Sequence, residues 1–262
     1  MSTKLNNLVT GQYILLARSF IAIIGCIGVW WGIVGFPVFW RESSTGRIAD
    51  RIIAGDPFKT EILARQLPII DIIDSIQRAA YCRPGSLRSA AIIQLRMVEV
   101  FASANAGKPR NERLESLGDV IRSSLSCSPA DPFLWLALFW VTNTQNGAKA
   151  DYLKYLQMSY QLGQNEGWIG SKRNRLAFSE FEQLPADLAE SAISEFVGLV
   201  ESGFTQQAAE IFIGSSRGAR DAVLTRLNFL PDRYREQFLA ELSRLDYDGD
   251  QQTILRSEPR KR

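Results

Sequence analysis

One long apolar segment near the N-terminus constrains this chain more than any other feature. Residues 13–40 carry a single charge, Arg18, and residues 19–40 carry none. At about 1.5 Å per residue, an α-helix over residues 19–40 would be about 33 Å long, close to the hydrocarbon thickness of a bilayer. The segment is apolar on every side, unlike the one-sided helices of soluble domains. It predicts a single-pass transmembrane anchor over residues 13–40, after an N-terminal tail of residues 1–12.

A cleaved signal peptide is the main alternative for this segment. A signal peptide would have an apolar core of about 7–15 residues, followed by small residues at the cleavage site. Here the apolar run is longer and ends in bulky residues around Pro37, with no Ala-x-Ala. Aromatic residues such as Tyr13 at one end and Trp40 at the other are typical of the two membrane interfaces. We therefore expect the segment to stay uncleaved.

Four glycines in the segment fall on one helix face: Gly25, Gly28, Gly32 and Gly35. At 100° per residue their spacing keeps them within roughly 80° of one another, and Gly28 and Gly32 form a GxxxG pair. Such a face lets two helix backbones approach closely. It favours a homodimer or docking on another membrane helix. Glycine is also common in membrane helices that do not pair, so both interpretations stay open.

The charges on the two sides of the anchor favour its two possible orientations almost equally. Lys4 and Arg18 lie on the N-terminal side, whereas Arg41, Arg47 and Arg51 follow the anchor, which slightly favours a cytoplasmic C-terminal domain. However, no acid precedes the end of the anchor, and long C-terminal domains are translocated largely regardless of charge. A short tail before a single anchor more often stays inside. We therefore expect a cytoplasmic (inner) membrane protein with its C-terminal domain in the periplasm.

The charge balance and the histidine content exclude several classes of function for the rest of the chain. Two of the 30 basic residues precede residue 41, which leaves 28 against 28 acidic residues. This neutral balance argues against nucleic acid as a partner. The chain has no histidine, which removes histidine bases, Ser–His and Cys–His pairs and histidine-ligated metals. Cys26 lies in the anchor, and Cys82 and Cys127 either form a disulfide or remain two free thiols.

Most of the chain beyond residue 46 has helical patterning with short breaks. Proline and glycine mark the breaks at residues 83–85, 108–109, 128–129, 146–147, 184–185, 201–203 and 230–231. The pattern predicts helices over residues 47–54, 58–81 with a break at Pro68, 86–105, 111–126, 132–145, 149–162, 167–182, 186–201, 205–213, 217–229 and 232–245. No segment alternates like a strand, so the predicted fold class is all-α. Beyond the anchor we divide the chain into four parts. They are a juxtamembrane helical segment (residues 41–85), helical repeats (86–202), C-terminal helices (203–247) and a flexible tail (248–262).

An internal period supports a repeat architecture. Trp135 and Trp168 are 33 residues apart, and each lies near the start of a predicted helix. Periods near 34 residues are typical of stacked helical hairpins. The intervening stretch resembles a tetratricopeptide repeat: Trp135 and Leu138 match its Trp and Leu positions, and Leu156 and Ser159 lie near its later large and small positions.

The resemblance is best over residues 129–168 and weaker on either side, and Gln164 stands where the family usually has proline. It implies a protein-binding groove lined by the first helix of each hairpin. Carried over by position, and joined by the neighbouring basic run, the groove residues are Trp140, Asn143, Thr144, Lys172, Arg173 and Arg175. In the alternative interpretation, Trp140 belongs to the core and the others are ordinary surface residues.

No residue pattern in the chain indicates a reaction. Carboxylate pairs such as Glu180 with Glu182, and Glu236 with Glu241, have basic neighbours, as solvated helix faces do. Phosphate-binding loops, dinucleotide fingerprints, CxxC and GxSxG motifs do not occur. We expect no enzymatic activity, no cofactor and no metal. A membrane-bound enzyme acting on sugars or lipids through carboxylates is the least favoured alternative.

The chain is also similar to small anchored repeat proteins of bacterial envelopes. That resemblance implies an adaptor or scaffold that holds a partner protein near the membrane, in polysaccharide assembly or secretion. In the second interpretation, the protein is a structural subunit of a larger membrane complex, docked through the glycine face of its anchor.

Overall fold

The computed structural model describes residues 2–56, 82–103, 110–147, 149–164 and 166–245, without the side chains of 2–17, 34–35, 37–44, 101–103 and 110. The described residues contain helices and no strand, which confirms the all-α fold class. The helices are α1 (Ser2–Ile53), α4 (Pro84–Ser103), α5 (Arg110–Cys127), α6 (Pro132–Asn146), α7 (Ala150–Leu162), α8 (Gly167–Ser179), the 3-10 helix η1 (Phe181–Gln183), α9 (Ala186–Glu201), α10 (Thr205–Ile213), α11 (Arg217–Leu227) and α12 (Asp232–Arg244).

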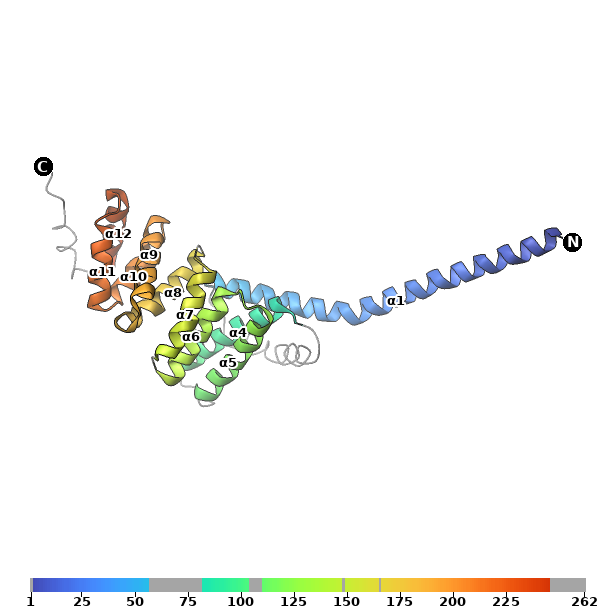
Figure 1. The fold of residues 1–262 in the computed structure, drawn as a ribbon, viewed down its shortest axis with the longest axis horizontal. Helices are drawn as coiled ribbons and strands as arrows, with labels where there is room; N and C mark the ends of the chain where they lie inside the picture. The colour runs from blue at the N-terminus through green and yellow to red at the C-terminus, as the bar shows by residue number, and fades with distance from the viewer. Residues whose placement is uncertain (1, 57–81, 104–109, 148, 165, 246–262) are drawn as a thin grey trace.

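Helix α1 projects away from the packed helices, and its C-terminal end contacts α4 (Figure 1). Thr45 and Ala49 are buried at this end. The separate helix predicted over residues 47–54 is therefore the last part of α1. Burial explains the continuity, since the preceding Ser-Ser-Thr-Gly run is a poor helix former on its own.

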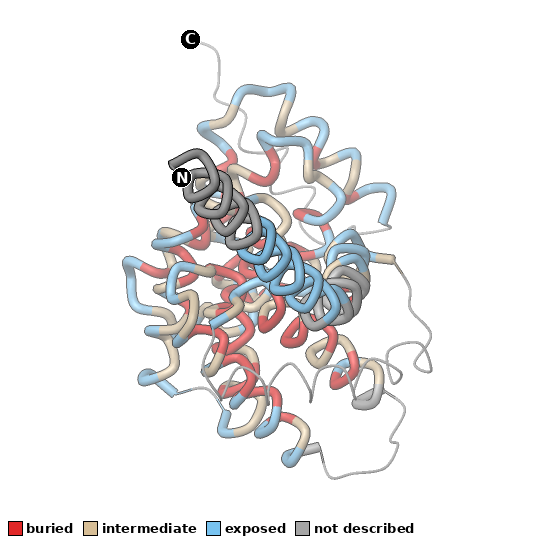
Figure 2. The backbone as a smooth tube through the Cα atoms, turned by 90° about the vertical axis from the view of Figure 1, so that its right-hand side faces the viewer, coloured by how far each residue is buried: buried red, intermediate tan, exposed pale blue. Residues whose placement is uncertain are grey.

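Large apolar side chains cover the described middle of α1. They are between 54% and 72% exposed: Phe20, Ile21, Ile23, Ile24, Ile27, Val29, Trp30, Trp31, Ile33 and Phe36. Buried residues gather in the packed helices instead (Figure 2). Other side chains of the predicted anchor, at residues 13–17, 34–35 and 37–40, lie outside the described set. Among the described residues, no helix combines the length and the apolar character needed to cross a membrane.

Helices α4 to α9 pack as three successive hairpins: α4 with α5, α6 with α7, and α8 with α9. The first helices of these hairpins also touch in order, since α4 contacts α6, α6 contacts α8, and α8 contacts α10. This is the arrangement of a helical-repeat stack, in which each hairpin covers the apolar face of its neighbour. The structure therefore fits the predicted repeat architecture.

Most helix boundaries fall where the proline and glycine breaks predict them. Helices α9 and α10 have the predicted bounds, and Gly203 between them has a φ of +83°. The Phe204 N–H donates to the Leu199 carbonyl over 2.9 Å, as in the glycine-terminated ends of many helices. One prediction is wrong at its end: the helix predicted over residues 167–182 is divided into α8 and η1, with Glu180 between them. The predicted helix 58–81 lies outside the described residues.

An aromatic core holds the C-terminal helices together. Phe178, Phe196, Phe212 and Phe238 come from α8, α9, α10 and α12, and each is at most 1% exposed. The Phe196 ring centroid lies 5.6 Å from that of Phe178 and 5.7 Å from that of Phe238, within the range of favourable aromatic pairs. Phe196 is therefore the centre of this core.

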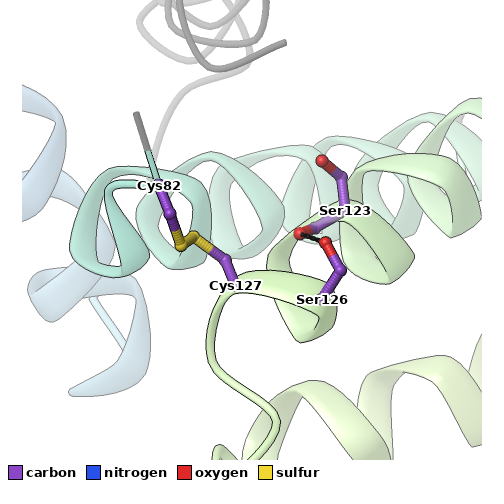
Figure 3. The surroundings of a disulfide bond; sticks show 4 residues. All are labelled: Cys82, Ser123, Ser126 and Cys127. Atoms are coloured by element: carbon purple, nitrogen blue, oxygen red, sulfur yellow. Dashed lines mark hydrogen bonds between the residues drawn. A yellow bond between two sulfur atoms is a disulfide. The ribbon is translucent and has the colours of Figure 1, made fainter. Parts of the chain in front are cut away.

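A disulfide closes the open end of the first hairpin. Cys82 precedes α4 and Cys127 ends α5, and their Cα atoms are 5.6 Å apart (Figure 3). In the same turn of α5, the Ser126 hydroxyl donates to the Ser123 carbonyl over 2.7 Å. Of the two states that the sequence leaves open, the structure has the bonded one. Cys26 is an exposed free thiol on α1.

A candidate binding groove on alternate helices

A groove of about 340 Å³ opens on the row of first helices. Its described lining comes from α4 (Leu95, Glu99), α6 (Phe133, Leu136, Ala137, Trp140), α8 (Ser171, Lys172, Arg175, Leu176) and α10 (Gln207, Ile211). None of these residues comes from α5, α7 or α9. The groove therefore lies on the face that the repeat resemblance implies.

Helix α6 supplies the apolar floor of the groove. The floor residues Phe133, Leu136, Ala137 and Trp140 are spaced so that they share one helix face, and Trp140 is only partly buried. The start of this helix is fixed by Asp131, whose Oδ1 accepts the backbone N–H of Phe133 over 3.0 Å. Pro132 follows at the first helical position, where a missing N–H costs nothing. Local capping thus sets the register of the floor.

Arg88 links the starts of three groove helices. Its Nε donates to Oδ2 of Asp131 over 2.8 Å, so α4 is tied to the cap of α6. The Arg88 guanidinium also lies 5.7 Å from the ring centroids of Phe133 on α6 and Trp168 on α8, a favourable distance for a cation over an aromatic ring. This cluster holds α4, α6 and α8 at a defined spacing beneath the groove.

The charges of the groove are unevenly distributed. Lys172 on α8 is exposed and has no ion-pair partner among the described residues. Arg175, also on α8, pairs with Glu210 of α10 at 3.1 Å. On the α4 side, Glu99 pairs with Arg96 at 3.0 Å. The groove therefore has an apolar floor, a basic wall at α8 and a single acid at α4.

The structure divides the predicted groove residues among three places. Trp140, Lys172 and Arg175 line the groove. Asn143 instead lines a separate cavity of about 120 Å³, where its side-chain amide donates to Oε1 of Glu180 over 2.8 Å. Thr144 is partly buried and lines neither cavity.

Arg173 is fully buried, so the prediction that it lines a binding surface is wrong. Its guanidinium donates to the carbonyls of Ser159 and Gly163, over 2.5 Å and 2.8 Å, at the C-terminal end of α7. It also forms an ion pair with Glu195 of α9. The Ser159 carbonyl accepts the bond from Arg173 in addition to that from the Gly163 N–H, and the helix dipole favours a cation at this end of a helix. Arg173 therefore joins α7, α8 and α9 from within the core.

Tyr160 and Glu195 complete this buried cluster. The Arg173 guanidinium lies 4.4 Å from the centroid of the Tyr160 ring. Burial raises the pKa of Tyr160 well above its usual value, and the neighbouring Glu195 carboxylate raises it further. Burial also raises the pKa of Glu195, against the opposing effect of Arg173. Because Arg173 is fully buried and its partners lie on α7 and α9, we expect the cluster to fix how the hairpins stack.

The sequence missed the groove residues on α4 and α10, where the repeat resemblance is weak or absent. Leu95, Glu99, Gln207 and Ile211 face the groove because their helices continue the row begun by α6 and α8. These residues could have been predicted by assuming that the first helix of every hairpin continues the row formed by α6 and α8.

Three of the four carboxylates named for the least favoured alternative have a partner within the chain. Glu180 accepts from Asn143, Glu182 accepts from the Ser216 hydroxyl over 2.9 Å, and Glu241 pairs with Arg244 at 2.8 Å. In the part of the chain that the structure describes, no three His, Cys, Asp or Glu residues lie together as a metal site requires.

The glycine face of α1 is uncovered where it is described. A side chain added at Gly25, Gly28 or Gly32 would meet no atom within 4 Å. The surroundings of Gly35 lie outside the described residues. The face is therefore open to a second helix.

Comparison with known proteins finds no relative: no family model, no curated protein and no solved structure matches the chain. The fold itself defines the class, an all-α protein of stacked helical hairpins with a groove on its first helices.

Proposed function

We propose that this protein is a membrane-anchored adaptor of the tetratricopeptide type, whose groove binds a segment of a partner protein. The single observation that carries the proposal is the open groove on α4, α6, α8 and α10. A partly exposed tryptophan at its floor is the kind of residue that contributes most to protein interfaces. Binding is proposed because the described lining combines apolar residues of α6 with charged residues of α4 and α8, as peptide-binding grooves do.

The anchor in this proposal is α1. Its exposed apolar residues extend from Phe20 to Phe36 and include Trp30 and Trp31. Contiguous apolar surface of this kind is unfavourable in water and is typical of a membrane or protein interface. The uninterrupted apolar sequence of residues 19–40 favours the membrane.

The disulfide supports a periplasmic position for the hairpin domain. Disulfides persist in oxidising compartments and are rare in the cytoplasm. The Cys82–Cys127 bond therefore adds weight to the orientation expected from the short N-terminal tail. Partners from envelope polysaccharide assembly or secretion are the first to test.

Site-specific crosslinking in cells tests the groove. A photo-reactive amino acid replaces Gln207 in the groove of the full-length protein, and in a control it replaces Lys154, which is exposed on α7 outside the groove. We expect a discrete protein adduct from position 207 only, and its loss in the Trp140→Ala variant. Equal adducts from both positions, or an adduct that does not depend on Trp140, would contradict binding in the groove.

The uncovered glycine face supports a second candidate function, a structural subunit docked through its anchor. The two functions differ in which part captures the partner. If a chain of residues 41–262 still yields the adduct from position 207, the groove suffices and the adaptor is supported. If capture requires residues 13–40, and replacing Gly28 and Gly32 by leucine abolishes it, the protein is a docked subunit.

A further inference from the structure

We infer that the groove selects an acidic segment with an apolar side chain, and that the segment binds with its carboxylates over α8 and its apolar side chain over α6. This inference rests on the proposed function, because it names the partner chemistry of the same groove. It follows from the positions of four charged groups around an apolar floor.

The first group is Lys172, the exposed cation without an ion-pair partner among the described residues. It lines the groove together with Leu176 of its own helix and the apolar residues of α6. A carboxylate brought into the groove at this point would give Lys172 the ion-pair partner that it lacks among the described residues. Complementary charge of this kind mainly determines specificity and association rate.

The second and third groups are Arg175 and Glu210. Arg175 lines the groove, but Glu210, which holds it through one guanidinium nitrogen, does not. Glu210 also accepts from Gln206 over 3.2 Å. Because a guanidinium has five donors, Arg175 keeps donors for a second carboxylate while Glu210 fixes its position. The charge presented to the groove at α8 is therefore positive.

The fourth group, Glu99, determines the orientation in which an acidic segment binds. It lines the α4 side, where it would repel a carboxylate of the bound segment. Arg96, its ion-pair partner, is not among the lining residues. An acidic segment therefore places its carboxylates at α8, and the opposite orientation is penalised by contact between like charges.

A random peptide library displayed on phage and selected on the full-length protein in neutral detergent micelles tests this inference. We expect selected peptides to combine an aliphatic or aromatic residue with Asp or Glu, and to lose binding in the Trp140→Ala variant. Charge reversal at Lys172, in Lys172→Glu, should weaken a selected peptide roughly tenfold. Lys154→Glu makes the same change of charge outside the groove and should leave the affinity unchanged.

The double variant Lys172→Glu/Arg175→Glu gives the sharpest result. It should select peptides rich in Lys or Arg from the same library, with the same dependence on Trp140. Peptides that need Trp140 but show no acidic bias would overturn the charge preference and leave the groove function in place. If no selected peptide depends on Trp140, both the inference and the proposed function fail.

Discussion

Helix α1 and the hairpin domain use the same apolar residue types in opposite environments. Phe20 on α1 is 65% exposed, whereas Phe196 on α9 is fully buried among three other phenylalanines. The domain buries its apolar surface by stacking hairpins, whereas α1 packs against α4 near its C-terminal end and stays exposed from Phe20 to Ile33. The difference teaches that identical residue types serve as core in one region and as exposed apolar surface in the other.

The strongest test of this contrast compares two Phe→Ala substitutions. Phe196→Ala should lower the free energy of unfolding of the domain by about 3–5 kcal/mol, because it leaves a cavity at the centre of the aromatic core. Phe20→Ala should change it by about 0.5 kcal/mol or less, since the residue packs against nothing described. Urea unfolding of both full-length variants in micelles gives the comparison. Similar losses from both would mean that α1 contributes to the domain core.

A second pair of substitutions compares two arginines. Arg173→Met should cost about 3–5 kcal/mol, because it leaves the largely buried Glu195 carboxylate without its cation and the Gly163 carbonyl without this donor. Arg18→Met, on exposed α1, should leave unfolding of the domain unchanged. If Arg173→Met has no effect in the same unfolding measurement, the buried cluster does not hold the hairpins together.

The cysteines provide a third pair. Cys127→Ser should lower the stability of the domain by about 2–4 kcal/mol, because the bond closes a long loop and restricts the unfolded chain. Cys26→Ser on α1 should have no effect on it. Reductant should reproduce the loss in the wild-type protein and have no further effect on Cys127→Ser. A wild-type protein insensitive to reductant would show that the bond does not contribute.

The smallest expected effect concerns pH and the buried Tyr160. Its pKa is raised in the folded state, so the unfolded chain loses the proton first as the pH rises above about 10. The contribution of protonated Tyr160 to the free energy of unfolding is thus fully present below about pH 10. Above this pH it falls by at most about 1.4 kcal/mol per pH unit. Tyr160→Phe should flatten this fall relative to the wild-type protein. Identical alkaline profiles for Tyr160→Phe and the wild-type protein would contradict the burial effect.

Much of the domain was predictable because short-range signals determine helix ends. Proline at 185 and glycine at 203 bound α9, and the structure places its ends at the predicted residues. The groove was predictable in outline through the repeat resemblance, which placed Trp140 on its floor. These features depend on residues close together in the chain.

The error at Arg173 arises because the prediction assigned a whole basic run to the surface. Lys172, Arg173 and Arg175 form one basic run, yet only Arg173 faces inward. The buried residues of α8 are Ile169, Gly170, Arg173, Asn174, Ala177 and Phe178, a regular helical stripe. This spacing already places Arg173 on the core face, but its partner Glu195 lies on another helix, and no local pattern indicates that pairing.

The most direct test of the account is whether the tryptophans of α1 reach the hydrocarbon of a bilayer. The full-length protein is reconstituted in vesicles whose lipids carry bromine deep in their acyl chains, and quenching of tryptophan fluorescence is measured. We predict clear quenching that is largely lost in the Trp30→Phe/Trp31→Phe variant and retained in Trp135→Phe. Absence of quenching, or quenching that persists without Trp30 and Trp31, would contradict a membrane position for α1.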